Sequence, residues 1–160
     1  MSHEQSPLII GRTEYIALPR WGIFGLRAKI DTGARSSALH VEQIELLPQR
    51  QVAFDVVIRQ KGKGKRTRVS AQIIRESFVR SSTGERDKRL FVETTLRLGP
   101  IERRIEISLV DRAAMIHRML LGRNALTGPI LIDVNSTYRL GRPKKPSTKK
   151  KHLNKQGNSG

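Results

Sequence analysis

Apolar and polar positions alternate along this chain over short stretches, which is the period of β-strands. Between residues 101 and 110, for example, one side of an extended chain carries Ile101, Arg103, Ile105, Ile107 and Leu109. Turns rich in Gly, Pro and Ser separate these stretches, a pattern typical of all-β barrels. The expected strands cover residues 13–18, 26–31, 37–46, 51–59, 66–74, 75–80, 90–98, 101–110, 119–122 and 130–134.

The pattern predicts one short helix, near the C-terminal end. It begins at Arg123 and ends before the Thr-Gly-Pro at residues 127–129. Two polar turns, at residues 61–65 and 81–87, close hairpins, and the first has a strongly cationic tip. The pattern over residues 111–119 does not distinguish a helical turn from irregular chain.

The stretch Asp31-Thr32-Gly33 places an acid directly after an apolar strand. A carboxylate there lies near the core, where a charged group is costly unless it has partners. The Thr32 hydroxyl and the backbone N–H groups around Gly33 can supply those partners. An ordinary turn after a strand uses the same residue types. The motif alone therefore fits either a turn or an active site.

A second motif favours the active site. The apolar residues 119–121 run into Gly122 and then into the helix that begins at Arg123. This Leu-Leu-Gly-Arg-Asn and the earlier Asp-Thr-Gly-Ala resemble, in order and spacing, the paired motifs of retropepsin-like aspartic peptidases. The resemblance implies a retropepsin-like closed β-barrel in which the second motif passes behind the active-site loop. It also implies that the loop consists of Asp31, Thr32 and Gly33.

The sequence contains a single Asp-Thr-Gly, because every other aspartate is followed by different residues. Aspartic peptidases need two carboxylates in contact, one as a base on water and one as an acid on the scissile carbonyl. One motif can supply that pair only through a second copy of the chain about a two-fold axis. The hypothesis therefore predicts a homodimer. The resemblance implies that Thr32 bonds across the dyad.

Further segments narrow the resemblance. Residues 8–140 contain Ile-Ile-Gly, Ala-Leu-Pro, Ala-Lys-Ile-Asp-Thr-Gly-Ala-Arg-Ser-Ser-Ala-Leu-His, Thr-Thr-Leu-Arg-Leu-Gly and Met-Leu-Leu-Gly-Arg. They are similar to retropepsin-like proteins of RimB type, often called ATP-dependent zinc proteases, which occur beside or fused to RimK-type ATP-grasp glutamate ligases. This implies hydrolysis of the poly-glutamate tail that such a ligase adds to a small-subunit ribosomal protein. It makes the ligase a candidate partner.

The charge of the chain fits an acidic substrate. It has 31 basic and 14 acidic residues, a net charge of +17. Eight of the basic residues follow residue 138, which leaves 23 against 14, or +9, on the body. Basic walls raise the local concentration of a polyanion. The candidate substrate contacts are Ala34, Arg35, His40, Arg75, Arg80, Arg86 and Arg123, with Lys88 and Arg89 beside them.

Two of these candidates carry open questions. Viral retropepsins commonly have an acid where this chain has Arg35, and that acid pairs with the arginine of the second motif. Arg35 and Arg123 therefore share no acid of this kind, and a substrate carboxylate could supply the charge. His40 lies nine positions after Asp31. It fits a structural role better than a substrate contact.

No metal or cofactor is expected. The chain has no cysteine and no His-Glu-x-x-His, and its four histidines are scattered, whereas zinc needs three or four converging ligands. The glycines at residues 61–65 lack the spacing of a phosphate-binding loop. The zinc and ATP in the family's common name thus find no support in the sequence.

The chain is expected to comprise a flexible N-terminus at residues 1–7, a peptidase domain at 8–140 and a disordered Lys-rich tail at 141–160. The tail is a candidate contact with ribosomal RNA. No apolar run is long enough to cross a membrane. The polar start and the absence of cysteine favour a cytoplasmic location, which disfavours cell-wall peptides as substrates.

The alternative is a basic module without catalytic activity that binds RNA, the ribosome or an acidic protein, with Asp31 structural. The charge supports this alternative equally well. The paired motifs favour the peptidase, because a binding module does not need them. The scarcity of aromatic residues argues mildly against a reader of single-stranded RNA.

Overall fold

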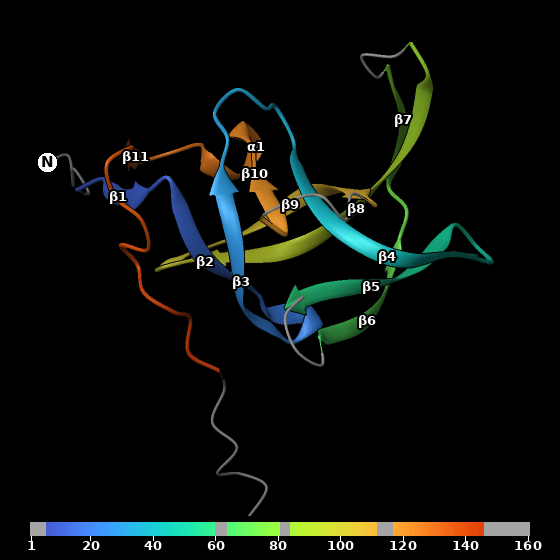
Figure 1. Ribbon diagram of the computed structural model, residues 1–160, viewed down its shortest axis with the longest axis horizontal. Coiled ribbons are helices and arrows are strands. Elements are labelled where there is room, and N and C mark those ends of the chain that lie inside the picture. The colour runs from blue at the N-terminus through green and yellow to red at the C-terminus, as the bar shows by residue number, and fades with distance from the viewer. Residues whose placement is uncertain (1–5, 60–63, 81–83, 112–116, 146–160) are drawn as a thin grey trace, which may run out of the picture.

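The computed structural model describes residues 6–59, 64–80, 84–111 and 117–145, and it is built almost entirely of β-strands (Figure 1). The strands run in chain order as β1 Leu8–Gly11, β2 Thr13–Leu18, β3 Ile23–Ile30, β4 Ser37–Leu47, β5 Gln51–Arg59, β6 Lys65–Gln72, β7 Arg75–Arg80, β8 Arg86–Leu98, β9 Ile101–Val110, β10 Met119–Leu121 and β11 Ile130–Asp133. A 3₁₀ turn, η1, covers Pro19–Trp21, and one short helix, α1, covers Arg123–Leu126.

Six strands close into a barrel. They pair in the order β10-β3-β2-β8-β9-β4, and β10 also pairs with β4, which completes the circle. Closure leaves these strands no free edge. The predicted closed all-β barrel with one short helix is confirmed.

Three further parts extend the barrel. The hairpin β5–β6 continues the sheet outward from β4, and β7 pairs with β8 to form a second hairpin. The second hairpin reaches beyond the barrel at the upper right of Figure 1. Strands β1 and β11 form a separate parallel pair that brings the two ends of the domain together, with Ile9 opposite Leu131.

The core lies inside the barrel and consists of branched aliphatic side chains from nearly every strand. Ile16, Leu26, Leu39, Ile107 and Met119 are fully buried within one cluster. Burial of each such side chain contributes about 1.5–3 kcal/mol. Of the residues that alternate on one side of β9, Ile105, Ile107 and Leu109 are buried, whereas Ile101 and Arg103 are only partly buried.

Some boundaries differ from those expected. Strand β3 begins at Ile23, three residues before the predicted start at residue 26. It can begin there because Gly22 closes η1 in the left-handed conformation, with φ of 68°. At the other end, Arg142 donates a hydrogen bond to the hydroxyl of Tyr15. Contacts with the barrel therefore continue beyond residue 140, where the sequence predicts the tail to begin.

Several expectations lie outside the described residues. They concern residues 1–5, most of the tail at 146–160, the hairpin tips at 60–63 and 81–83, and the ambiguous stretch at 112–116. In the described part of the chain, no helix is long and apolar enough to span a membrane.

Candidate active site

The loop that follows β3 holds the Asp31 carboxylate in a fixed position. The backbone N–H of Asp31 donates to the carbonyl oxygen of Leu121 at 2.9 Å. The N–H of Gly33 donates to Oδ1 of Asp31 at 3.1 Å. A Cβ on Gly33 would lie 3.3 Å from that same oxygen, tighter than most such contacts. Glycine therefore suits the close approach of backbone to carboxylate.

The second motif lies directly behind this loop. Strand β10 runs parallel to β3, with Leu121 beside Ile30, and antiparallel to β4. At the end of β10, a Cβ on Gly122 would lie 2.3 Å from the carbonyl oxygen of Ser36. Only glycine lets the returning loop cross here. The arrangement agrees with the resemblance, in which the second motif passes behind the active-site loop.

The start of α1 binds the loop through its backbone. The N–H of Arg123 donates to the carbonyl oxygen of Ala34 at 2.8 Å, and the N–H of Asn124 to that of Arg35 at 3.1 Å. The Arg123 side chain donates to the carbonyl oxygen of Thr32 at 2.9 Å. Three groups from one helical turn thus bind three loop carbonyls, those of Thr32, Ala34 and Arg35.

A partly buried polar network around Ser37 and Asn124 supports these contacts. Neither residue was a predicted site residue. The hydroxyl of Ser37 donates to Oδ1 of Asn124 at 2.8 Å and accepts from the N–H of Gly122 at 3.1 Å. The Asn124 amide then donates to the carbonyl oxygen of Glu106 on β9 at 3.0 Å. Ser37 follows the Asp-Thr-Gly by a few residues, but only the fold brings it to Asn124.

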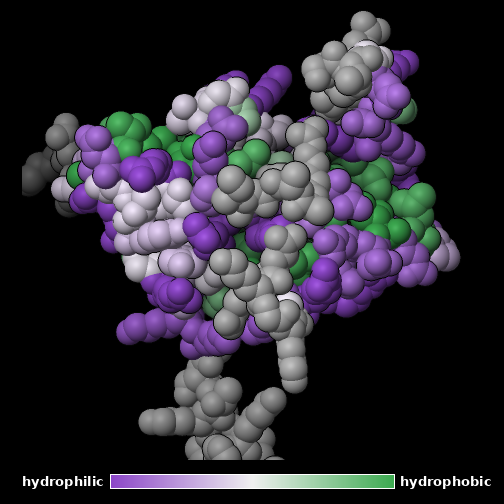
Figure 2. Space-filling model, in the orientation of Figure 1, coloured by the Kyte–Doolittle hydropathy of each residue, from purple (hydrophilic) through white to green (hydrophobic). Residues whose placement is uncertain are grey.

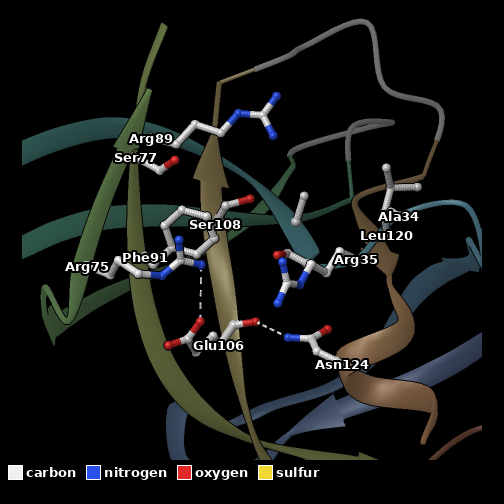
Figure 3. Close-up of a pocket in the computed structure, with 12 residues that line it drawn as sticks. Ala34, Arg35, Arg75, Ser77, Arg89, Phe91, Glu106, Ser108, Leu120 and Asn124 are labelled. Carbon is white, nitrogen blue, oxygen red and sulfur yellow. Dashed lines mark hydrogen bonds and ion pairs between the residues drawn. The ribbon is translucent and has the colours of Figure 1, made fainter. Parts of the chain in front are cut away.

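A cavity of about 660 Å³ opens beside the loop (Figure 3). It is walled by the loop, β7, β8, β9 and the start of α1. Its lining residues include Ala34, Arg35, Ser36, Arg75, Ser77, Arg89, Phe91, Glu106, Ser108 and Asn124. Of the predicted substrate contacts, the fold thus brings Ala34, Arg35 and Arg75 together, with Arg89 beside them.

The basic residues of this cavity approach it from opposite sides. Figure 3 shows Arg75 reaching in from β7 and Arg35 from the loop. The Arg75 guanidinium lies 3.8 Å from the ring centre of Phe91 and 3.2 Å from the Glu106 carboxylate. An arginine held on an aromatic face and paired with one acid is well oriented for a second anion.

The cavity distinguishes the two hairpins. Strands β7 and β8 supply four of its lining residues, whereas the described residues of β5 and β6 supply none. Retropepsin-like peptidases close over the substrate with a hairpin called the flap, and the sequence left open which of these two hairpins would take that role. The structure places the β7–β8 hairpin beside the Asp31 loop.

The remaining predicted contacts lie elsewhere. Arg86 is at the outer end of the hairpin, where its guanidinium lies 5.3 Å from the ring centre of Phe78. The side chain of Arg80 is outside the described residues. His40 is completely buried, with Nε2 3.4 Å from the Glu42 carboxylate. A substrate contact for His40 is therefore wrong, since solvent does not reach its ring.

Within the described ranges, no three His, Asp or Glu side chains converge as metal ligands. The Asp31 carboxylate contacts the backbone N–H of Gly33, which is a hydrogen-bond donor and not a metal ligand.

The fold is a retropepsin-like barrel with an Asp-Thr-Gly loop at the end of β3. The model of the RimB-like family, described as retropepsin-like aspartic endopeptidase RimB, matches residues 9–143. The chain belongs to this family.

Relatives and a solved structure agree. The chain is 31% identical over 136 residues to a probable alpha-L-glutamate ligase of Shewanella pealeana, and 32% identical over 137 residues to one of Parasynechococcus marenigrum. These matches cover 83% and 84% of this chain but only 30% and 29% of those proteins. The fold is similar to the crystal structure of a Legionella pneumophila protein of unknown function, with TM-score 0.69 and 25% identity, covering 84% of this chain and 99% of that one.

Proposed function

We propose that this protein is an aspartic endopeptidase that hydrolyses acidic, glutamate-rich peptides with a dyad of Asp31 from two subunits. The observation that carries the proposal is the Asp31 loop, which the second motif holds at its back through Gly122 and Arg123. Family membership supports the same chemistry. No cofactor takes part in the proposed reaction.

The proposed reaction needs only water and the two carboxylates. The ionised Asp31 removes a proton from water, whose oxygen attacks the scissile carbonyl carbon. The protonated Asp31 of the second subunit donates its proton to the carbonyl oxygen. The tetrahedral intermediate then returns its hydroxyl proton to that carboxylate while the first Asp31 protonates the nitrogen. The C–N bond breaks to release an acid and an amine.

A second copy is required because the chain supplies one such carboxylate. A surface next to the loop suits that copy. The backbone carbonyl oxygen of Arg12, the residue between β1 and β2, accepts a hydrogen bond from the N–H of Ile30 at 3.0 Å. On the adjacent β1–β11 pair, Ile9 and Leu131 are 42% and 55% exposed. Figure 2 shows hydrophobic surface over this part of the molecule. The pair packs on the core through the fully buried Ile10, so that Ile9 and Leu131 lie on the opposite side and offer apolar surface to a partner.

The cavity supports an acidic substrate. Arg35, Arg75 and Arg89 line it together with a single acid, Glu106. A glutamate side chain of the substrate would pair with these guanidinium groups, which bind carboxylates in a bidentate manner. In this proposal the β7–β8 hairpin closes over the peptide as the flap.

The names of the relatives suggest a source for such a peptide. They are called probable alpha-L-glutamate ligases, and this chain matches only about a third of their length. The proposed substrate is therefore the poly-glutamate tail that a RimK-type ligase adds to a small-subunit ribosomal protein. The ligase is a proposed partner, and the reaction would take place in the cytoplasm.

The second candidate function is a non-catalytic module that binds RNA or an acidic protein. The net charge of +17 favours it. In that case Asp31 would only complete the loop, and its replacement by asparagine would leave binding and biological effect unchanged.

Turnover of a peptide with a poly-α-glutamate tail tests the proposal. Wild type should cleave it in the presence of EDTA, and Asp31→Asn should not. Arg35→Ala should raise KM about tenfold or more, since one charge-assisted contact is worth about 1.5–3 kcal/mol. Arg66→Ala, on β6 away from the cavity, is the matched control. Cleavage retained by Asp31→Asn but abolished by EDTA would contradict the aspartic mechanism.

A further inference from the structure

A second cavity, of about 330 Å³, lies where the C-terminal segment crosses β2 and the turn between β8 and β9. Its lining includes Tyr15, Arg97, Leu140, Arg142 and Lys144, and none of the residues of the Asp31 loop. Three of these side chains are basic. The cavity therefore offers a positively charged surface that the peptidase reaction does not use.

A stack of rings and guanidinium groups ends at this cavity, which two of its members, Tyr15 and Arg142, line. Tyr15 and Tyr138 stack with ring centres 4.5 Å apart and planes at 23°. The guanidinium of Arg27 lies 5.9 Å from the ring centre of Tyr138, and that of Arg142 lies 4.5 Å from the ring centre of Tyr15. The order is thus Arg27, Tyr138, Tyr15, Arg142. Exposed Arg142 is the outer end of the stack.

The segment that carries Arg142 is firmly held. Glu14 is completely buried, and its carboxylate accepts from the N–H groups of Arg139 at 3.0 Å and Leu140 at 3.1 Å. The side chain of Leu140 packs against Gly99, where an added Cβ would lie 3.1 Å away. Arg142 also donates to the Tyr15 hydroxyl at 3.2 Å. The cavity is therefore largely preformed, which lowers the entropic cost of binding.

The basic groups are available to an anion. Arg97 pairs with Glu102 at 3.4 Å, a surface ion pair that contributes little. In the described part of the chain, Arg142 and Lys144 have no carboxylate within ion-pair distance. The sequence beyond the cavity continues with Lys145, Lys149, Lys150, Lys151 and Lys155 and contains no acid.

We propose that this cavity binds single-stranded nucleic acid, with phosphates on Arg142, Lys144 and Arg97 and a base stacked on the outer face of the Arg142 guanidinium. Bases stack on arginine planes as they do on aromatic rings. An acidic peptide would satisfy the charges but has no planar group to extend the stack. The scarcity of aromatic residues does not oppose this site, because the stacking surface is a guanidinium group that rests on two tyrosines.

The consequence is a tether separate from the peptidase site. Nucleic acid bound here would hold the protein near a nucleic-acid-bound partner and leave the cavity beside Asp31 open. The proposal does not depend on the peptidase activity. A failure of either one leaves the other standing.

Fluorescence polarisation with a labelled oligouridylate tests the site in the full-length protein. Arg142→Ala should weaken binding about fivefold or more through lost stacking. It should also lower the slope of log K against log salt by about 0.7, the value for one phosphate contact. Arg142→Lys should keep the slope and lose affinity. Arg66→Ala also removes one arginine, on β6, and its affinity should stay within about twofold of that of wild type.

Three further ligands sharpen the test. An abasic strand of equal length should bind wild type about as weakly as oligouridylate binds Arg142→Lys. Tighter binding of oligouridylate than of oligothymidylate would assign the site to RNA. Equal binding of the two would assign it to single-stranded nucleic acid of either kind. The proposal is overturned if Arg142→Ala behaves like Arg66→Ala. It is also overturned if poly-glutamate competes as strongly as oligouridylate and with the same dependence on Arg142.

A chain that ends at Lys145 is the control for the contribution of the Lys-rich tail. Loss of the tail should weaken binding overall but preserve the ratio of affinities between wild type and Arg142→Ala. Complete loss of binding, with no remaining dependence on Arg142, would contradict a site in the cavity. Thermal unfolding of each variant establishes that the fold is retained.

Discussion

Ser37 and Asn124, 87 positions apart, are joined by a hydrogen bond of 2.8 Å that ties the first strand after the Asp31 loop to the helix beneath it. The same Asn124 side chain donates to the carbonyl oxygen of Glu106 at 3.0 Å. One amide thus connects the loop side of the site to β9. The position of the Asp31 loop depends on this connection.

Asn124→Ala should remove both bonds and leave partly buried polar groups unpaired. We expect a loss of about 1–3 kcal/mol in the free energy of unfolding. For a chain of this size, that corresponds to a fall of about 2–10 °C in Tm. Asn135→Ala, at an exposed position, is the matched control and should change Tm by less than about 2 °C. Equal effects of the two variants would show that the network does not stabilise the site.

Substitutions at two glycines should separate an effect on stability from an effect on catalysis. In Gly122→Ala the new methyl would meet the Ser36 carbonyl at 2.3 Å and force the loop apart. We expect a loss of at least about 2 kcal/mol. In Gly33→Ala the methyl would lie 3.3 Å from the Asp31 carboxylate. That variant should lose less than about 1 kcal/mol in stability and far more in kcat, because the contact falls on the proposed nucleophile-activating group.

Chemical denaturation and peptide turnover, measured on both variants, check this separation. A Gly33→Ala protein with wild-type kcat would mean that the carboxylate does not need its backbone contact. A Gly122→Ala protein with wild-type stability would contradict the close crossing of the two motifs.

Glu14→Gln should loosen the C-terminal segment. The buried carboxylate accepts from Gly11, Arg139 and Leu140, whereas a glutamine places an NH₂ donor against one or more of these N–H groups. We expect a loss of about 2 kcal/mol or more, a fall in Tm of about 4–8 °C. Glu45→Gln, whose side chain is 64% exposed in a pair with Arg68, should lose under about 1 kcal/mol. A smaller loss of stability in Glu14→Gln than in Glu45→Gln would show that the Glu14 carboxylate does not hold the C-terminal segment.

Stability should fall in acid through Asp133. The Ser136 hydroxyl donates to its carboxylate at 2.6 Å, and this bond, with a second from the N–H of Asn135, lowers the pKa of Asp133. A lowered folded-state pKa stabilises the protein above the unfolded value of about 3.9. The contribution is lost as the pH falls through the folded-state pKa. Ser136→Ala should therefore be less stable than wild type at pH 7, and the difference should shrink toward pH 3.

Urea unfolding at the two pH values measures this difference. Asp133→Asn is the control, because it lacks the titrating carboxylate. The difference in stability between Asp133→Asn and the double variant Asp133→Asn/Ser136→Ala should therefore not vary with pH. A Ser136→Ala defect that is as large at pH 3 as at pH 7 would assign the effect to another contact.

The sequence was sufficient for the barrel and the Asp31 loop because both rest on local patterns. The alternation in residues 101–110 marks the strand β9. The Asp-Thr-Gly and Leu-Leu-Gly-Arg motifs mark the two segments that meet. Their meeting itself, β10 beside β3, is a long-range pairing that the resemblance supplied and periodicity could not.

Other features were beyond the sequence for physical reasons. Glu14 reads as an exposed charge in a strand, and only the C-terminal segment, 125 positions away, explains its burial. His40 alternates with buried Leu39 and Val41, yet β4 is covered on both sides and buries all three. The choice between the two hairpins needed the fold, because in the sequence both tips are only polar turns between strands.

The central claim is that each active site takes one Asp31 from each of two subunits. The most direct test mixes wild type with Asp31→Asn, allows subunits to exchange, and measures turnover of the poly-glutamate-tailed peptide. With equal amounts of the two proteins, a shared dyad predicts about one quarter of the activity of wild type at the same total concentration, since only one pairing in four is intact. About one half, the activity of independent subunits, would contradict the shared dyad.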